Sequence, residues 1–231
     1  MKKQLIAVVS ALAMTFASLP CVSIAAEIVP KPVLQYTFDG NKQLADQNGK
    51  NELKLSGGAS VTDDGNKGKG LLLDGTDGYA ELPDNILSSD MTITTWVKIN
   101  KFTTWGRVFD FGTDSNQNFF FAPYSGGASR VEIKNGATVD TMDCTQETAK
   151  DWVNYAITIK GDTVSYYRNG RLIKSKSGIK DISELTNTAN YIGKSHYDGD
   201  AYLSAVVDDF RVYNRALSQD EILKVMADGE I

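Results

Sequence analysis

The chain contains very little cysteine. Only Cys21 and Cys144 occur in 231 residues. Cys21 lies in an N-terminal stretch that we expect to be removed, so Cys144 would remain alone and an internal disulfide is excluded. A chain of this length can bury a core large enough to fold without such cross-links. The sequence therefore predicts one domain of ordinary size.

Dense runs of lysine and arginine are also missing, and the formal net charge is −5. Nucleic acids and anionic membranes are usually bound by clustered positive charge. Neither is therefore expected as a partner. An acidic chain of this kind is compatible with a neutral ligand such as a polysaccharide.

No apolar run reaches the roughly 20 residues that a membrane-spanning helix needs. The run at residues 5–19 follows two lysines and leads into a small-residue stretch at residues 23–26. This order is typical of a secretory signal peptide. We therefore expect a signal peptide over residues 1–25 and a mature chain over residues 26–231, with no membrane anchor. Its location would be secreted and extracellular, or periplasmic.

What the chain does have is a period-two alternation of apolar and polar residues, in short runs separated by Gly, Asn and Asp. This pattern is typical of strands that bury one side, and its repetition predicts an all-β sandwich or barrel. The expected strands cover residues 33–38, 53–55, 70–73, 79–82, 91–99, 107–111, 118–124, 130–134, 152–160, 163–168, 171–176, 191–194 and 202–213.

Local signals refine the C-terminal half of this prediction. Residues 161–162 (Gly-Asp) separate two alternating runs, and residues 169–170 (Asn-Gly) are the favoured sequence for a two-residue type I′ hairpin. Residues 152–176 should therefore form a three-stranded meander. Near the C-terminus, Ser218 and Glu221 form a capping box ahead of an apolar stretch, which predicts one short helix.

Several segments together resemble one known family. They are residues 36–40, 91–98, 166–172, 191–195 and 207–218, of which the last is the most specific. The order of these segments is similar to that of the laminin-G-like, concanavalin A-like jelly rolls found with bacterial glycoside hydrolases. The resemblance implies an antiparallel jelly-roll sandwich of two sheets, with about six or seven strands each and adjacent terminal strands. It implies no single function, because one fold hosts many.

Catalytic patterns are missing. Some relatives of this fold are glucanases that place carboxylates as Glu-x-Asp-x-x-Glu on one strand face, and no such run occurs here. Glu132 is isolated, and Asp140 and Asp143 lie in a stretch without strand alternation. The loop around His196, the sole histidine, does not match a polysaccharide lyase. The sequence favours a protein without catalytic activity, with a hydrolase or lyase as the weaker alternative.

Asp39 and Asp208 are candidate calcium ligands. The resemblance implies a structural calcium ion where the terminal strands meet, and it points to these two residues. Asp208 shares strand parity with Phe210 and Val212, which predicts an inward-facing carboxylate that needs a partner. Two interpretations stay open. Either calcium binds there, or backbone N–H groups or an arginine satisfy Asp208 while Asp39 makes a turn.

Aromatic and planar polar side chains are candidates for binding a sugar, because sugar C–H groups stack on flat rings and hydroxyls bond to planar polar groups. Trp105 is the best candidate. Arg107 shares strand parity with it, whereas Asp110 falls on the opposite face, so Arg107 and Asp110 are not expected to pair. The candidate ligand-binding residues are Trp105, Arg107, Tyr124, Arg130, His196 and Tyr197.

These features predict a secreted, non-catalytic, lectin-like module that binds an extracellular polysaccharide or glycan. The alternative is an extracellular module for adhesion that binds another protein, since laminin-G-like domains also bind proteins.

Overall fold

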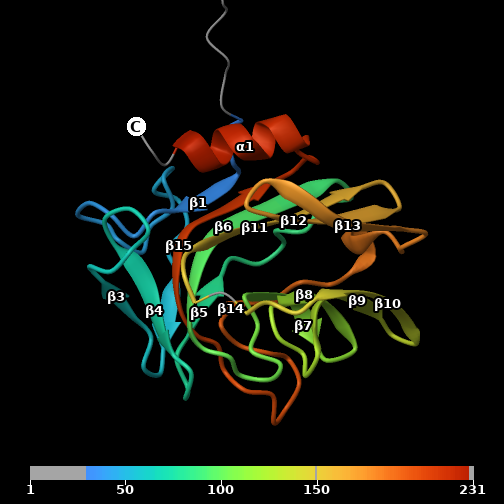
Figure 1. Cartoon of the computed structure of the whole chain (residues 1–231), viewed down its shortest axis with the longest axis horizontal. Coiled ribbons are helices and arrows are strands. Elements are labelled where there is room, and N and C mark those ends of the chain that lie inside the picture. The colour runs from blue at the N-terminus through green and yellow to red at the C-terminus, as the bar shows by residue number, and fades with distance from the viewer. Residues whose placement is uncertain (1–29, 149, 229–231) are drawn as a thin grey trace, which may run out of the picture.

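The computed structural model describes residues 30–148 and 150–228, so the signal peptide predicted over residues 1–25 lies outside the described residues. Two antiparallel sheets lie face to face, and a helix crosses the outer surface of one of them (Figure 1). The expected jelly-roll sandwich is thereby confirmed. In the described part of the chain, no helix is long and apolar enough to cross a membrane.

The first sheet has eight strands, in the order β13-β12-β11-β6-β15-β4-β3, with β1 paired to β15. The pairing of β1 with β15 makes the terminal strands neighbours, as the family resemblance implies. The predicted meander is also confirmed, since β11, β12 and β13 pair in sequence. The strands are β1 (Leu34–Tyr36), β3 (Ser60–Thr62), β4 (Gly70–Asp74), β6 (Met91–Lys101), β11 (Val153–Lys160), β12 (Thr163–Arg168), β13 (Arg171–Ser177) and β15 (Ser204–Tyr213).

The second sheet has seven strands, in the order β10-β9-β8-β7-β14-β5-β2. A 3₁₀ turn, η1 (Ile182–Glu184), precedes β14. The strands are β2 (Lys54–Ser56), β5 (Tyr79–Leu82), β7 (Phe109–Asp114), β8 (Gln117–Ala122), β9 (Ala128–Asn135), β10 (Thr138–Thr145) and β14 (Ala189–Ile192).

The strands β3 and β10 were not expected from the sequence. Asp140 and Asp143 come from a stretch without strand alternation, yet they lie in β10, so the expectation that this stretch forms no strand was wrong. β10 lies at the edge of the second sheet, where its backbone pairs with β9 along eight residues. It buries little besides Met142. An edge strand of this kind shows no apolar alternation for the sequence to reveal.

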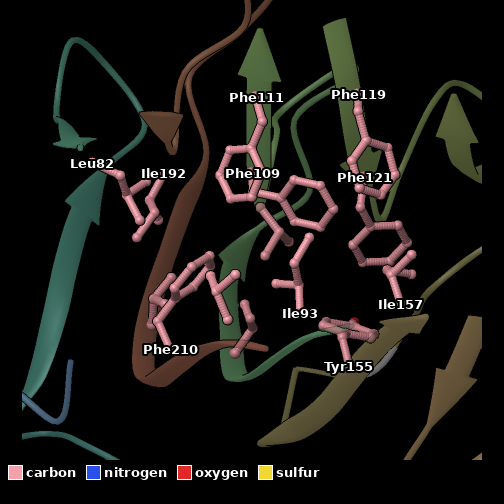
Figure 2. Close-up of a cluster of buried hydrophobic side chains, with 14 of the residues drawn as sticks. Leu82, Ile93, Phe109, Phe111, Phe119, Phe121, Tyr155, Ile157, Ile192 and Phe210 are labelled. Atoms are coloured by element: carbon pink, nitrogen blue, oxygen red, sulfur yellow. The ribbon is translucent and has the colours of Figure 1, made fainter. Parts of the chain in front are cut away.

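The core between the two sheets is rich in aromatic side chains (Figure 2). Phe119 and Phe121 of β8 point inward, and the ring of Phe121 packs edge-on against Tyr155 of the opposite sheet at a centroid distance of 5.0 Å. Inward and outward side chains alternate along these strands, as a pleated strand requires. Phe120, between the two inward phenylalanines, therefore faces away from the core.

The helix α1 (Gln219–Asp228) covers the outer surface of the first sheet. Ile222 and Val225 pack there against Tyr213 of β15 in a second, smaller apolar cluster. The predicted capping box is confirmed. The backbone N–H of Glu221 donates to Ser218 Oγ, and the Glu221 carboxylate accepts from the N–H of Ser218.

Strand β15 contains a bulge that exchanges its two faces. Ala205 and Val207 lie in the core between the sheets before the bulge, and Phe210 and Val212 lie there after it. The pairing with β6 shifts between Asp208 and Arg211, and Asp209 has a φ of 46°. The expectation that Asp208 faces inward was therefore wrong, because strand parity does not carry across a bulge. Asp208 lies on the outer face of the sheet.

Candidate functional site

A hollow of about 160 Å³ lies on the outer face of the second sheet. Its floor comes from β8 and β9, where Phe120 and Glu132 are direct cross-strand partners. Its walls come from the loop before β7 and from the loop between β14 and β15. We call it the Trp105 hollow, and it is lined by Trp105, Arg107, Phe120, Arg130, Glu132, Tyr197 and Asp200. Four of the six predicted ligand-binding residues thus meet in one place.

Arg107 is the centre of this arrangement. Its guanidinium carbon lies 3.7 Å from the ring centroid of Phe120, so the cation covers the outward-facing ring. Its Nη2 donates to Asp200 Oδ2 at 2.9 Å. Burial lowers the pKa of Arg107, and the carboxylates of Asp110 and Asp200 oppose that effect. The buried cation thereby holds together parts of the chain that are far apart in sequence.

The expectation that Arg107 and Asp110 do not pair was wrong. The Nε of Arg107 lies 3.5 Å from Asp110 Oδ2, and both side chains are almost fully buried. Arg107 precedes β7, which begins at Phe109, so the alternation of a strand does not apply to it.

Trp105 offers a half-buried ring at the mouth of the hollow. Its ring centroid is 5.2 Å from the guanidinium carbons of both Arg107 and Arg130. Its backbone has a φ of 66°, in a region that bulky residues rarely adopt. The N–H of Trp105 donates to the carbonyl of Tyr124 at 2.9 Å, which helps to hold this conformation. Left-handed backbone of this kind is often found at binding sites.

Arg130 of β9 lies on the floor of the hollow. Its Nε and Nη2 donate to the two carboxylate oxygens of Asp143, at 2.7 and 2.9 Å. These hydrogen bonds raise the pKa of Arg130 and lower that of Asp143. Such a two-point pair fixes the plane of the guanidinium group. Arg130 is thereby held in place beside Glu132 on the floor of the hollow.

His196 and Tyr124 lie outside the lining of the Trp105 hollow. The His196 side chain is only 4% exposed, with Nδ1 at 2.8 Å from Asp110 Oδ1 and Nε2 at 2.9 Å from the carbonyl of Ala189. These two contacts hold the loop that carries His196 and Tyr197 against the sheet. The ring of Tyr124 packs instead against Phe102, at a centroid distance of 6.0 Å.

Phe120, Glu132 and Asp200 also line the hollow, although they were not among the predicted ligand-binding residues. A signal existed for Phe120. It is the middle one of three consecutive phenylalanines, and period-two alternation sends it to the face opposite its neighbours. No local pattern singles out Asp200, because Arg107, its partner, is 93 positions away.

A second hollow, of about 240 Å³, lies where the terminal strands meet and includes Asp39 and Asp208 in its lining. Asp208 accepts the backbone N–H groups of Lys67 at 2.9 Å and Asp209 at 2.6 Å. Burial raises the pKa of Asp208 to about 6; these N–H groups oppose the rise, and the carboxylates of Asp209 and Asp39 add to it. Among the described residues, no group of three or more His, Cys, Asp and Glu side chains could hold a metal ion.

A family model described as the concanavalin A-like lectin/glucanases superfamily matches residues 74–223. The chain belongs to this superfamily. The resemblance seen in the sequence is thereby confirmed. The chain is also similar to an alpha-L-arabinofuranosidase of Bifidobacterium longum subsp. longum, with 28% identity over 201 residues. The match covers 76% of this chain but only 18% of that enzyme, so the chain spans about a fifth of its relative's length.

Solved structures show the same fold. One is domain 4 of AbnA, a GH43 extracellular arabinanase from Geobacillus stearothermophilus, in complex with arabinotriose. It has a TM-score of 0.74 and 22% identity, covering 84% of this chain and 98% of that one. Another is the binding domain of botulinum neurotoxin serotype D/C, with a TM-score of 0.69, 14% identity and coverage of 86% and 52%. At these identities the likeness concerns the fold alone.

Proposed function

We propose that this chain is an extracellular, non-catalytic module that binds carbohydrate in the Trp105 hollow. The observation that carries the proposal is the convergence of Trp105, Arg107, Arg130 and Tyr197, which come from separate loops and strands. A sugar needs an aromatic ring for its C–H face and planar polar groups for its hydroxyls. The hollow offers both.

The relatives support a particular class of ligand. The similar Bifidobacterium enzyme is an alpha-L-arabinofuranosidase, and the arabinanase domain of the same fold was solved with arabinotriose. That arabinanase is described as extracellular, in keeping with the signal peptide expected here. We therefore propose an arabinose-containing polysaccharide as the ligand, met outside the cytoplasm.

The carboxylates of the Trp105 hollow favour binding over catalysis. Glycoside hydrolysis needs one carboxyl group that gives up a proton and a second that acts as nucleophile or base. Asp200 accepts hydrogen bonds from Arg107 and from Ser195 Oγ. Glu132 accepts them from Arg130 and Thr141. Both carboxylates are thus engaged as acceptors and hold the walls of the hollow in place.

We expect Trp105→Ala to weaken binding of arabinotriose about 30-fold, because the loss of a central aromatic contact costs about 2 kcal/mol. Isothermal titration calorimetry of arabinotriose and arabinan into both proteins measures the change. Tyr124→Ala is the matched control, since this neighbouring ring does not line the hollow, and its affinity should stay within about 2-fold of wild type. Unchanged affinity in Trp105→Ala would place the site elsewhere. A wild-type protein that binds no glycan would favour the protein-binding alternative.

We also propose that calcium binds between Asp39 and Asp208. The two carboxylates line one hollow together with the oxygen-bearing side chains of Thr37 and Asn66, and calcium prefers oxygen ligands from carboxylates, amides and backbone carbonyls. The ion would join the N-terminal region to β15. It would play a structural part, since the Trp105 hollow is built from other elements.

Removal of calcium should lower the melting temperature. Saturating calcium at about 100 times its dissociation constant adds about 2.7 kcal/mol of stability. For a domain of this size that corresponds to about 5–10 °C. Thermal unfolding of chelator-treated protein, with and without added calcium, measures the shift, and calorimetric titration measures the binding. Asp39→Asn, at an exposed position, should abolish the response. Absence of both heat and stabilisation in the wild type would refute the calcium site.

A further inference from the structure

A larger hollow, of about 550 Å³, lies at the other end of the second sheet, between β2, β5 and β14. We call it the Tyr191 hollow. Its lining includes Lys54, Glu81 and Tyr191, which are direct cross-strand partners in adjacent strands. Their neighbours along the strands, Ala80 and Ile192, are buried in the core between the sheets. The three side chains therefore stand on the outer face, the same face that carries the Trp105 hollow.

One row of cross-strand partners joins the two hollows. Tyr191 pairs with Asp110 of β7, Asp110 pairs with Phe120, and Phe120 pairs with Glu132. Four strand spacings of about 4.8 Å thus separate Glu81 from Glu132, a distance of about 19 Å. Between them the loop after β14 covers Asp110, whose carboxylate accepts the N–H of His196. The hollows are therefore neighbours on one face, separated by this loop.

The chemistry of the Tyr191 hollow suits a polyhydroxylated ligand. Neither the ammonium group of Lys54 nor the carboxylate of Glu81 forms an ion pair with any residue in the part of the chain that the structure describes. Tyr79 Oη donates a long hydrogen bond of 3.5 Å to Glu81 Oε1, which leaves the second carboxylate oxygen, beside the Lys54 ammonium group, for sugar hydroxyls.

Tyr191 supplies the apolar wall of this hollow. Its half-buried ring is held edge-on against Tyr79, at a centroid distance of 5.6 Å and an angle of 89°. Lys194 lies over the same ring, with its Nζ 4.7 Å from the centroid. The ring of His196 also packs against Tyr191, at a centroid distance of 5.0 Å. These contacts hold the Tyr191 ring in a defined position beside Lys54 and Glu81, so the hollow combines a fixed aromatic side chain with polar groups.

We propose that the Tyr191 hollow is a second carbohydrate site, which binds a further stretch of the polysaccharide chain held in the Trp105 hollow. This inference rests on the proposed function. Two linked sites on one face strengthen binding of a long chain, because the second contact forms at a high effective concentration. A short oligosaccharide in the Trp105 hollow gains nothing from the second site.

The test compares a polymer with a short ligand. Linear arabinan and arabinotriose are titrated into the wild type and into the double variant Lys54→Ala/Glu81→Ala. The affinity for arabinan should fall about 10-fold or more, and that for arabinotriose should change less than about 2-fold. Asp84→Ala, at an exposed position in the lining of the same hollow, is a second, independent variant with the same expected pattern. Lys160→Ala/Asp162→Ala removes a similar exposed pair of opposite charges from the hairpin between β11 and β12 of the other sheet, and it should match the wild type for both ligands.

The outcomes separate this inference from the proposed function. Arabinan affinity that is unchanged in both Tyr191-hollow variants overturns the second site, while Trp105→Ala still tests the first. An equal loss for arabinan and arabinotriose also overturns it, because the effect would then not depend on chain length. If the wild type binds neither ligand, the proposed function fails and the second site fails with it.

Discussion

Asp110→Ala is expected to lower the free energy of unfolding by about 3 kcal/mol, the low end of the range for breaking a buried ion pair, because the buried Arg107 then loses one carboxylate partner and keeps only Asp200. Asp110 is fully buried. Its carboxylate lies 3.5 Å from Arg107 Nε and 2.8 Å from His196 Nδ1, and it also accepts the N–H of His196. Alanine would remove all three interactions at once.

Chemical denaturation of the two proteins measures this loss. Asp143→Ala is the matched control, since it also breaks an Asp–Arg pair, but one whose carboxylate is 47% exposed. Exposed pairs contribute about 0–1 kcal/mol, so the control should differ little from wild type in stability. A loss below about 1 kcal/mol for Asp110→Ala would show that the buried network contributes little to stability.

The same substitution should weaken binding as well as folding. His196 and Arg107 tie the loop after β14 to the sheet through Asp110, and that loop carries Tyr197 and Asp200 into the Trp105 hollow. Asp110 is therefore a positioning residue for the proposed site. Asp110 does not line the hollow. Its effect on binding would therefore act through the loop, whereas Trp105 is expected to contact the sugar directly.

Phe121→Ala should also cost about 3–5 kcal/mol, the usual range for removing a buried phenylalanine. Phe121 is 1% exposed, and its ring contacts Tyr155 of the opposite sheet at a centroid distance of 5.0 Å (Figure 2). It also contacts Tyr166 of that sheet, at 5.1 Å. Alanine would leave a cavity between the sheets that the surrounding rings only partly fill. Thermal and denaturant unfolding of the variant both report the loss.

Val139→Ala provides the comparison for Phe121→Ala, because Val139 lies on edge strand β10 and is 48% exposed. Its effect should stay within about 0.5 kcal/mol. If the two variants were equally stable, the contact between Phe121 and the opposite sheet would not stabilise the sandwich as the packing implies.

The two hollows on the second sheet give the proposed function a consistent physical basis. Both lie on its outer face, away from the core between the sheets. The inward side chains form the apolar core, so the outward ones are available to contact a ligand. Binding sites on a rigid sheet also lose little entropy when the ligand arrives.

The sequence by itself determined the architecture of this protein. Period-two alternation indicated the strands other than β3 and β10 and, away from the bulge in β15, which of their side chains face inward. The Asn-Gly turn at residues 169–170 set the hairpin between β12 and β13. Both turn residues adopt positive φ, 49° and 71°, as a type I′ turn requires. The capping box at Ser218 placed the start of α1. These features depend on neighbours within a few positions, which the sequence displays directly.

Only the tertiary structure decided the sites. The bulge at Asp209 places Asp208 on the outer face of the sheet. Arg107 lies in the loop before β7, so it pairs with Asp110 although strand parity would put the two side chains on opposite faces. The Trp105 hollow exists because Arg107 meets Asp200, a residue 93 positions away. Contacts of this kind depend on how loops pack over a completed sheet. A local sequence pattern does not predict how the loops pack, because that packing depends on burial and charge pairing between residues far apart in the sequence.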